Sequence, residues 1–556
     1  MVKKSSLKLI PLGGFNEIGK NMMVVEKDNE MIVIDCGVMF PEDSFLGIDY
    51  VIPDFSYVKK NSDKLRALII THGHEDHIGA VPFLLKEVDV PISIYATKLT
   101  KGLIELKLND HQIYDGFILN EINENDKLTI GPFNLEFFRV NHSIPDSIGL
   151  VIKTDVGTVI FSGDFKFDQS PIDGKITQFS KIGSYGKDGV LALFCDSTNA
   201  EEAGYTLPEK DVGKTLFEKF TQARGRIIVA TFSTHIHRIQ QIMNMAQKFQ
   251  RKLAISGKSL LKTVKIASEL GFLKIPENLI IPISSIDDYP LKKVAILSTG
   301  TQGEPLSALY KMAINEHKRI QIMNSDMVII SASLIPGNEK AIDNIINMLI
   351  KRGADVFYES IADVHVSGHA AQEEIKMMIN LIRPKYYIPM HGDNMRRAMN
   401  KKIAIELNIP EENILMAQNG DVIKLNFNLC KVSKNINTRS IYVDGLGFGD
   451  VEDIVLKDRK ALARGGLIVN VVGVDFKRED FFYDPDIIFK GIAYLDNFDS
   501  IISECKKLIK ESVHACFSNN IKTPSTIEKY INDRLEKFLI KKIRLKPVII
   551  TKVLSN

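Results

Sequence analysis

Residues 71–77 read Thr-His-Gly-His-Glu-Asp-His, and their side chains could bind metal ions. Imidazole and carboxylate are ligands that zinc and similar borderline divalent metals prefer. The apolar run 65–70 directly precedes this heptad and is typical of a buried strand. A strand that ends in such a cluster brings several ligands to one point in space. The heptad therefore predicts a metal centre that activates water.

Three further residues of ligand type follow expected strands elsewhere in the chain: His142, Asp164 and His391. Each stands at the end of an apolar run, next to a small residue or glycine. Side chains at strand ends on one edge of a sheet can converge, as active-site groups on α/β scaffolds do. Alone, each is more typical of a surface histidine or a turn-forming aspartate. The heptad makes metal binding the better interpretation.

The composition is that of a globular protein of several domains, with 556 residues, 45% hydrophobic and 25% charged. No apolar run is long enough to cross a bilayer, so we expect a cytoplasmic protein without a membrane partner. The five cysteines are scattered, which argues against disulfides and against a cysteine zinc site. The net charge of +2 does not favour a nucleic-acid enzyme. The basic stretch 531–556 is either a solvated helix face or a phosphate contact.

The distribution of expected strands and helices along the chain indicates several domains. Residues 7–170 are rich in expected strands, whereas 206–372 alternate strands with helices. Such alternation is typical of βαβ units around a parallel sheet. We predict a metal domain in residues 1–205, an inserted domain in 206–372, a return segment of the metal domain in 373–430, a linker in 431–460 and a C-terminal α/β domain in 461–556.

The candidate ligands resemble, in order and context, those of the metallo-β-lactamase superfamily. They are His72, His74, Asp76, His77, His142, Asp164 and His391. Asp35 resembles the first motif of that superfamily, which supports the metal loop. The insertion carries landmarks similar to those of β-CASP nucleases, namely Asp196 and the run 365–369, His-Val-Ser-Gly-His. Segments including GGFNEIGKN, FPED, THGHEDHIGA, GDFKFD, STGTQGEP, IPGN and MHGD extend the resemblance to the ribonuclease J family over essentially the whole chain.

This resemblance implies a metallo-β-lactamase αββα sandwich with an inserted β-CASP parallel-sheet α/β domain and a small C-terminal α/β domain. The C-terminal domain would form a dimer or tetramer. Two Zn²⁺ ions per subunit are implied, with Mn²⁺ or Mg²⁺ as substitutes. One ion would be held by His72, His74 and His142, the other by Asp76, His77 and His391, with Asp164 as the bridge. Water shared by the two ions would become hydroxide near neutral pH and attack a phosphodiester.

The resemblance also implies roles for residues around the metals. Asp76 joins His369 and Asp196 in the expected catalytic set. His369 would protonate the leaving oxygen, and Asp196 would orient the imidazole of His369. The expected substrate-binding residues are His365, Val366, Ser367, Gly368, His369, Ser233, Thr234 and His235. A structural calcium is a further expectation, at Gly47, Asp49 and Asp444. Without the resemblance, the pair of histidines in 365–369 would be interpreted as a helix start packed against a loop.

The leading hypothesis is a zinc-dependent ribonuclease that degrades single-stranded RNA 5′ to 3′ from a monophosphorylated end and also cuts internally. Its roles would be mRNA decay and rRNA maturation, in an RNA-degradation complex. The alternatives are a small-molecule hydrolase, a nuclease acting on DNA and an RNA-binding scaffold without catalysis. The long insertion and His391 disfavour the first, the segments that resemble ribonuclease J disfavour the second, and the complete ligand set disfavours the third. Residues 257–259, Gly-Lys-Ser, lack the upstream glycine of a P-loop, and the glycine loop 299–305 is either a tight turn or an RNA contact.

Overall fold

The computed structural model describes residues 6–41, 45–304, 306–333, 338–445, 447–448, 453–492 and 498–555. Parts of three motifs fall outside these ranges: residues 42–43 of FPED, residue 305 of STGTQGEP and residues 335–337 of IPGN. The chain divides into two compact units. The first contains residues 1–42 and 49–441, and the second contains residues 43–48 and 442–556. Each unit has a hydrophobic core of its own.

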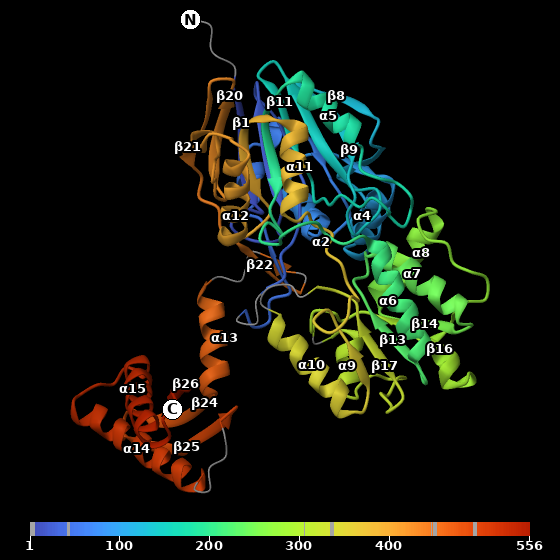
Figure 1. The fold of residues 1–556 in the computed structure, drawn as a ribbon. Coiled ribbons are helices and arrows are strands. Elements are labelled where there is room, and N and C mark those ends of the chain that lie inside the picture. Colours follow the sequence, from blue (N-terminus) through green and yellow to red (C-terminus); the bar gives the residue numbers. More distant parts are fainter. Residues whose placement is uncertain are drawn as a thin grey trace, which may run out of the picture. The chain divides into compact units, whose positions relative to one another are not determined.

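Two sheets packed face to face form the metal domain of the first unit (Figure 1). The first sheet has the order β21-β20-β1-β2-β3-β5-β6-β7, from β1 (Leu7–Gly13), β2 (Met22–Lys27), β3 (Glu30–Ile34), β5 (Leu65–Ile69), β6 (Ile92–Thr97), β7 (Phe117–Ile122), β20 (Asp421–Asn426) and β21 (Leu429–Asn435). The second has the order β19-β12-β11-β10-β9-β8, from β8 (Lys127–Ile130), β9 (Phe133–Arg139), β10 (Ile148–Thr154), β11 (Gly157–Phe161), β12 (Val190–Asp196) and β19 (Pro384–Met390). Apolar side chains of both sheets, such as Ile32 and Phe161, fill the space between them.

Helices cover the outer faces of this sandwich. The second sheet packs against α5 (Phe179–Asp188), α11 (Gln372–Ile382) and α12 (Asn394–Glu406), and together they form another buried cluster. On the first sheet, α4 (Lys98–Asp110) contacts β6 and β7. Strands covered on both faces bury nearly all their residues, and every residue of β12 is buried. The expected αββα sandwich is confirmed.

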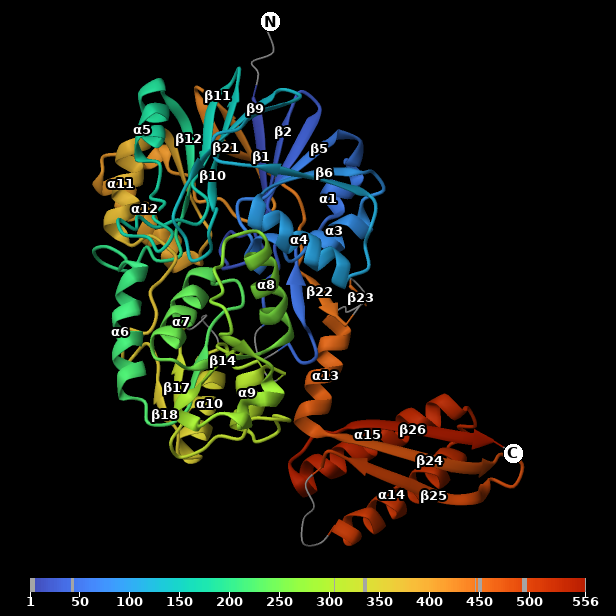
Figure 2. The same cartoon turned by 90° about the vertical axis from the view of Figure 1, so that its right-hand side faces the viewer.

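The inserted domain has a sheet of its own, with the order β15-β14-β16-β13-β17-β18 (Figure 2). Its strands are β13 (Ile227–Ala230), β14 (Lys252–Ser256), β15 (Ile280–Ile281), β16 (Val294–Ser298), β17 (Met327–Ile330) and β18 (Asp355–Phe357). All pairings between these strands are parallel. The helices are α6 (Glu209–Gln222), α7 (Ile236–Lys248), α8 (Lys258–Glu269), α9 (Ala308–Ala313) and α10 (Glu339–Lys351). The parallel sheet expected from the alternation of strands and helices is confirmed.

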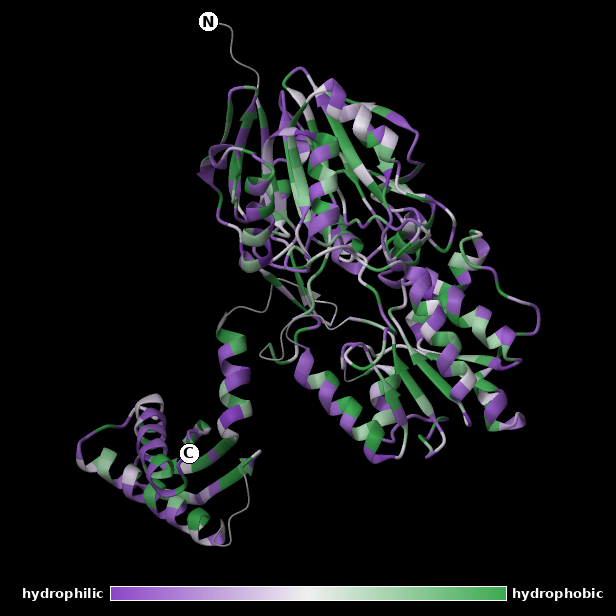
Figure 3. Ribbon diagram, viewed as in Figure 1, coloured by the Kyte–Doolittle hydropathy of each residue, from purple (hydrophilic) through white to green (hydrophobic). Residues whose placement is uncertain are grey.

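The second unit contains a sheet with the order β25-β24-β26, and two long helices pack on it. Its elements are α13 (Asp453–Gly465), β24 (Leu467–Asp475), β25 (Asp480–Lys490), α14 (Phe498–Ser518), α15 (Pro524–Ile543) and β26 (Val548–Ser555). The core contains Ile468 and Val472 of the sheet with Ile509 and Ile531 of the helices. Figure 3 shows the hydrophobic strands at the centre of the sheets in both units.

The expected linker at 431–460 is wrong at both ends. Its start lies in β21, which pairs with β20 at the edge of the first sheet. Its end lies in α13, and the second unit already begins at Tyr442. Four of the seven side chains of β21 are polar and five are exposed, as is common in edge strands, so no regular apolar alternation marks this segment. In the described residues, none of the helices has the length and apolar character to cross a membrane.

Candidate metal centre

The heptad lies where β5 ends and a short helix, α2 (Glu75–Ile78), begins. His72 and His74 are in the loop, and His77 is in the helix. Asp35 lies beneath this loop, where one carboxylate oxygen accepts a hydrogen bond from the Thr71 backbone N–H at 2.8 Å. Its other oxygen accepts one from His77 Nδ1, also at 2.8 Å. The buried carboxylate therefore holds both ends of the loop in place.

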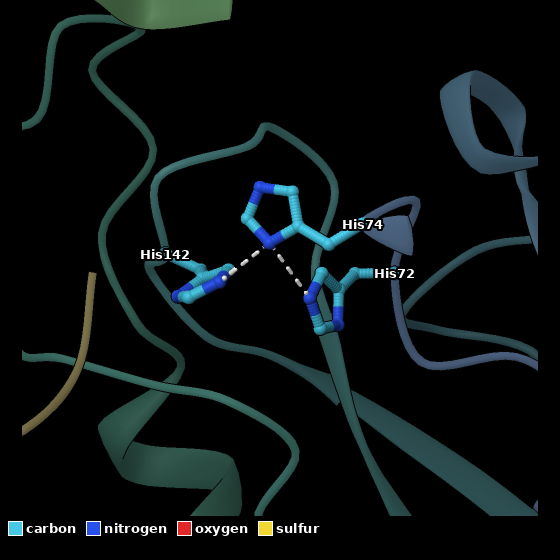
Figure 4. Close-up of side chains that lie close together, drawn as sticks. All are labelled: His72, His74 and His142. Atoms are coloured by element: carbon cyan, nitrogen blue, oxygen red, sulfur yellow. Dashed lines mark hydrogen bonds between the residues drawn. The ribbon is translucent and has the colours of Figure 1, made fainter. Parts of the chain in front are cut away.

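Three imidazoles form the first group of ligand atoms: His72, His74 and His142 (Figure 4). His74 Nδ1 lies 3.1 Å from His72 Nε2 and 3.0 Å from His142 Nε2. Two nitrogens bound tetrahedrally to one zinc ion at about 2.0–2.1 Å stand roughly 3.3–3.4 Å apart. The observed separations are within a few tenths of an ångström of that value. The group can hold one tetrahedral metal ion.

The second group joins two residues of the heptad to two distant strand ends. Asp164 follows β11 and His391 follows β19, and both lie beside Asp76 and His77. His77 Nε2 is 3.1 Å from Asp164 Oδ2, and His391 Nε2 is 3.3 Å from Asp76 Oδ2. Asp164 Oδ2 also lies 3.8 Å from His72 Nε2 of the first group. The Asp164 carboxylate therefore stands between the two groups.

The other nitrogen of each imidazole in the first group already has a partner. His72 Nδ1 is 3.1 Å from Thr71 Oγ1, His142 Nδ1 donates to the Gly368 carbonyl at 2.7 Å, and His74 Nε2 is 3.2 Å from Ser143 Oγ. Such outer partners fix the orientation of metal-binding imidazoles. In the second group, His391 Nε2 is buried 3.3 Å from Asp76 Oδ2 but makes no hydrogen bond with any of the described residues, which is costly unless a ligand satisfies it. Both groups therefore fit metal ions.

The electrostatics favour the metal-binding protonation states in the first group and at Asp164. Burial lowers the pKa of His74 to about 4, and it holds the pKa of His72 and His142 well below the ordinary value. These imidazoles are therefore neutral, as metal binding requires. Burial alone would raise the pKa of Asp164, but two neighbouring histidines outweigh it and hold that pKa well below the usual range. The carboxylate is therefore ionised. In the second group, burial would lower the pKa of His77 and His391, but neighbouring carboxylates, above all Asp164, raise it well above the ordinary value.

His369 lies beside both groups, with its ring centroid 4.9 Å from that of His142 and 5.5 Å from that of His391. Its Nδ1 donates to Asp196 Oδ2 at 2.7 Å. Burial lowers the pKa of His369, but the Asp196 carboxylate outweighs burial and raises it overall. This pair can therefore present a protonated imidazole next to the metal ligands.

The structure brings the run 365–369 together with residues 233–235. The ring centroids of His365 and His235 are 6.1 Å apart, and each ring has one buried nitrogen that finds no hydrogen-bond partner in the described part of the chain. Ser233 and Thr234 are half-buried in the loop before His235, whereas Val366 is buried. Ser367 Oγ accepts from the His369 N–H at 3.1 Å. A Cβ on Gly368 would lie 2.7 Å from the His142 ring, so this position needs glycine.

A buried ionic cluster behind His365 was not predicted. Arg238 is fully buried and donates to Glu209 Oε1 at 2.7 and 3.0 Å. Its Nη1 donates to the Val364 carbonyl at 2.6 Å, one residue before His365. Lys166 Nζ lies 4.0 Å from Glu209 Oε2. Lys166 lies in GDFKFD, one of the segments that carry the family resemblance, so the sequence marks its region. Glu209 and Arg238 look like ordinary helix residues in the sequence.

The oxygen atoms expected to hold calcium do not fit a metal ion. Arg459 of α13 donates to the carbonyl oxygens of Leu46 and Gly47 at 3.0 and 3.1 Å, and it also donates to the Asp444 carboxylate. A guanidinium therefore already occupies the place of a cation at Gly47 and Asp444. Asp49, the third residue of the expected site, belongs to the other compact unit.

Four family models match successive parts of the chain. They are the metallo-beta-lactamase superfamily (residues 16–202), the ribonuclease J beta-CASP domain (224–349), the Zn-dependent metallo-hydrolase RNA specificity domain (354–410) and the ribonuclease J C-terminal domain (454–556). The metal groups lie in the first and third of these matches. The fourth match covers the second unit from the second residue of α13 onward.

Curated relatives match over nearly the whole chain. Ribonuclease J 1 of Streptococcus pyogenes serotype M3 is 38% identical over 554 residues, which are 100% of this chain and 98% of that protein. Ribonuclease J2 of Bacillus subtilis is 38% identical over 553 residues, 99% of each chain. A crystal structure of a protein of unknown function from Enterococcus faecalis V583 covers 76% of this chain and 100% of its own, with a TM-score of 0.54 and 14% identity. That last similarity concerns the fold alone.

Proposed function

The chain belongs to the ribonuclease J family and is a metal-dependent ribonuclease, and from this premise we propose a zinc enzyme that cleaves single-stranded RNA. It degrades RNA 5′ to 3′ from a monophosphorylated end and also cuts internally. Its cellular roles are mRNA decay and rRNA maturation, within an RNA-degradation complex. The observation that carries the proposal is the pair of adjacent ligand groups with Asp164 between them.

The ligands divide into two sets that share one carboxylate. The first zinc ion would be held by His72, His74 and His142, the second by Asp76, His77 and His391, and both by Asp164. When bound, the ions would lower the pKa of water and neutralise negative charge on the phosphodiester. The outer hydrogen bonds of the imidazoles keep one nitrogen of each ring directed at its metal.

His369 supplies the proton for the leaving group. Water would give up one proton to solvent, and as its oxygen bonds to phosphorus, the bond from phosphorus to the 3′ oxygen breaks and His369 donates a proton to that oxygen. The products are a 5′-phosphate and a 3′-hydroxyl. Asp196 accepts the hydrogen bond from Nδ1 at 2.7 Å, so the other ring nitrogen is the donor. The position of His369 beside His142 and His391 supports this role.

RNA phosphates would be bound by His365, Ser367 and the loop 233–235. The free ring nitrogens of His365 and His235 support this assignment, because buried donors without partners suit an anionic ligand. His235 also stands at the start of α7, where a helix N-terminus favours negative charge. Gly368 leaves room for the backbone to pass close to His142.

The test is cleavage of 5′-labelled RNA carrying a monophosphate or a triphosphate. We expect the monophosphate to be degraded faster, with loss of cleavage but retention of RNA binding in Asp76→Ala/His77→Ala. Glu75→Ala is the matched control, because Glu75 lies in the same heptad but binds Lys107 at 2.6 Å instead of the metals. Full turnover by the double variant contradicts the metal assignment. Ester hydrolysis without RNA cleavage would favour a small-molecule hydrolase.

The C-terminal sheet would mediate self-association. One face packs on α14 and α15, and the other has an apolar row in which Val469 pairs with Ile488 and Ile550. Ile488 and Ile550 are 48% and 51% exposed, which is unusual for such side chains in a row. The next row holds Asp486 and Lys552 on either side of Val471. A two-fold axis through this face would pair the acid of one copy with the base of the other.

The oligomeric state tests this surface directly. Ile488→Asp is expected to convert the oligomer to a smaller species in light scattering coupled to size exclusion. Tyr483→Ser is the matched control, since Tyr483 is 54% exposed on the same strand but pairs with Gly473, two residues beyond the charged row. An unchanged mass for Ile488→Asp contradicts the proposed surface.

A further inference from the structure

Glu374, in the first turn of α11, is a fully buried carboxylate that binds three backbone N–H groups. Its Oε1 accepts from Phe167 at 2.6 Å, and its Oε2 accepts from Thr206 at 2.8 Å and from Ala371 at 2.9 Å. A buried charge is costly unless hydrogen bonds or a counter-ion compensate it. The bond to Ala371 is an ordinary helix cap, but the bonds to Phe167 and Thr206 join segments more than 160 residues away in sequence.

Each of the three segments leads directly to the metal centre. Phe167 is three residues after Asp164, and Ala371 is two residues after His369. Thr206 Oγ1 donates to the His369 carbonyl at 2.7 Å. The side chain of Glu374 therefore connects the loop of the shared metal ligand to the loop of the proton donor, while its own helix packs on the outer face of the sandwich.

We propose that Glu374 is a positioning residue for the reaction, which sets the place of His369 relative to Asp164. The inference rests on the proposed function, in which His369 protonates the leaving oxygen and Asp164 is shared by the metals. A helix cap alone would need only the bond to Ala371. The two additional bonds have no role in α11 itself, and they determine how far apart the two loops lie.

Glu374→Gln isolates this role because it keeps the size of the side chain. The amide has one oxygen for three N–H donors, so its NH₂ group must face at least one of them. If the amide oxygen stays with Thr206 and Ala371, the NH₂ group faces the Phe167 N–H, which lies 2.6 Å from the present oxygen. A shift of about 1 Å in a reacting group can slow an enzyme about 100-fold. We expect kcat to fall 10- to 100-fold, with KM and bound zinc unchanged.

Glu373→Gln is the matched control, because Glu373 is the adjacent residue and its partly exposed side chain pairs with Lys376. This variant is expected to keep the kcat of the unaltered protein. The conservative variant Glu374→Asp retains the charge, so it is expected to recover part of the lost kcat. It also carries the test if Glu374→Gln does not fold, as judged by circular dichroism.

A double-mutant cycle separates positioning from general loss of structure. If Glu374 acts through His369, then Glu374→Gln lowers kcat no further in a His369→Ala background. Independent losses that multiply in the double variant would overturn the proposal, as would a Glu374→Gln kcat equal to that of Glu373→Gln. A full-length unaltered protein that fails to cleave RNA would instead refute the proposed function. The two failures are therefore distinguishable.

Discussion

Asp35→Asn should weaken metal binding at the second ligand group, although it replaces none of the metal ligands. Asp35 accepts hydrogen bonds from the Thr71 N–H, from Thr71 Oγ1 and from His77 Nδ1. Asparagine has only one acceptor oxygen, and it tolerates the left-handed backbone at this position, where φ is 58°. If that oxygen stays with Thr71, the NH₂ group faces His77 Nδ1. The imidazole then keeps a hydrogen bond only by moving its proton to Nε2.

That proton would stand on the nitrogen directed at the metal. His77 Nε2 lies 3.1 Å from Asp164 Oδ2, so a protonated Nε2 donates to the carboxylate instead of binding zinc. Loss of such an outer partner lowers metal affinity about 10- to 100-fold. This is about 1.4–2.7 kcal/mol, since each tenfold change is about 1.4 kcal/mol. Imperfect satisfaction of the buried donors adds a loss of about 1–3 kcal/mol in the free energy of unfolding.

Zinc affinity is measured by competition with a chromophoric chelator, and stability by urea unfolding of the metal-free protein. Asp28→Asn is the matched control, because Asp28 also has a left-handed backbone, with φ of 49°, but its side chain is 65% exposed and touches Lys27. We expect the affinity for one of the two zinc ions to fall in Asp35→Asn. Neither affinity should fall in Asp28→Asn. Equal affinities in the two variants would refute the reasoning from the His77 tautomer.

Three further predictions concern stability. Asp326→Asn breaks a buried ion pair with Arg226, in which the two nitrogen–oxygen distances are 2.9 and 2.6 Å. The free energy of unfolding, measured by urea titration, should fall by about 3–5 kcal/mol. A loss below about 1 kcal/mol would contradict this prediction. Arg459→Ala should lower the melting temperature of the second unit, because its guanidinium binds Leu46, Gly47 and Asp444. Added Ca²⁺ should leave the melting temperature of the unaltered protein unchanged, and stabilisation by Ca²⁺ would restore the calcium hypothesis. Burial raises the pKa of Asp146 to about 7, above the value near 3.9 in an unfolded chain. Between these two pH values the folded state binds a proton that the unfolded state has lost. The free energy of unfolding should therefore fall as pH rises from about 4 to 7. Asp146→Asn should remove this part of the decline in thermal unfolding across that pH range, and an unchanged pH profile would show that the carboxyl is not protonated.

Local patterns in the sequence were enough for most of the fold. The alternation of strands and helices expected over residues 206–372 appears as the parallel sheet β13 to β18 with the helices around it. These elements have strong apolar periodicity because they pack on a core. An element without it was missed: β21 is an exposed edge strand, and its last residues lie in the segment expected to be a linker. Periodicity reports burial, so an element that buries little leaves no pattern.

The sequence by itself determined the chemistry available at the centre, because residue type decides which atoms can bind zinc and the heptad puts four of them within six positions. It also indicated which strand ends carry His142, Asp164 and His391. Only the tertiary structure decided which ligand atoms face one another. It also revealed the hydrogen bonds that Glu374 accepts from Phe167 and Thr206. In the expected calcium site it placed the guanidinium of Arg459. These contacts join residues far apart along the chain, and a contact of that kind depends on the path of the backbone between them, which no local pattern records.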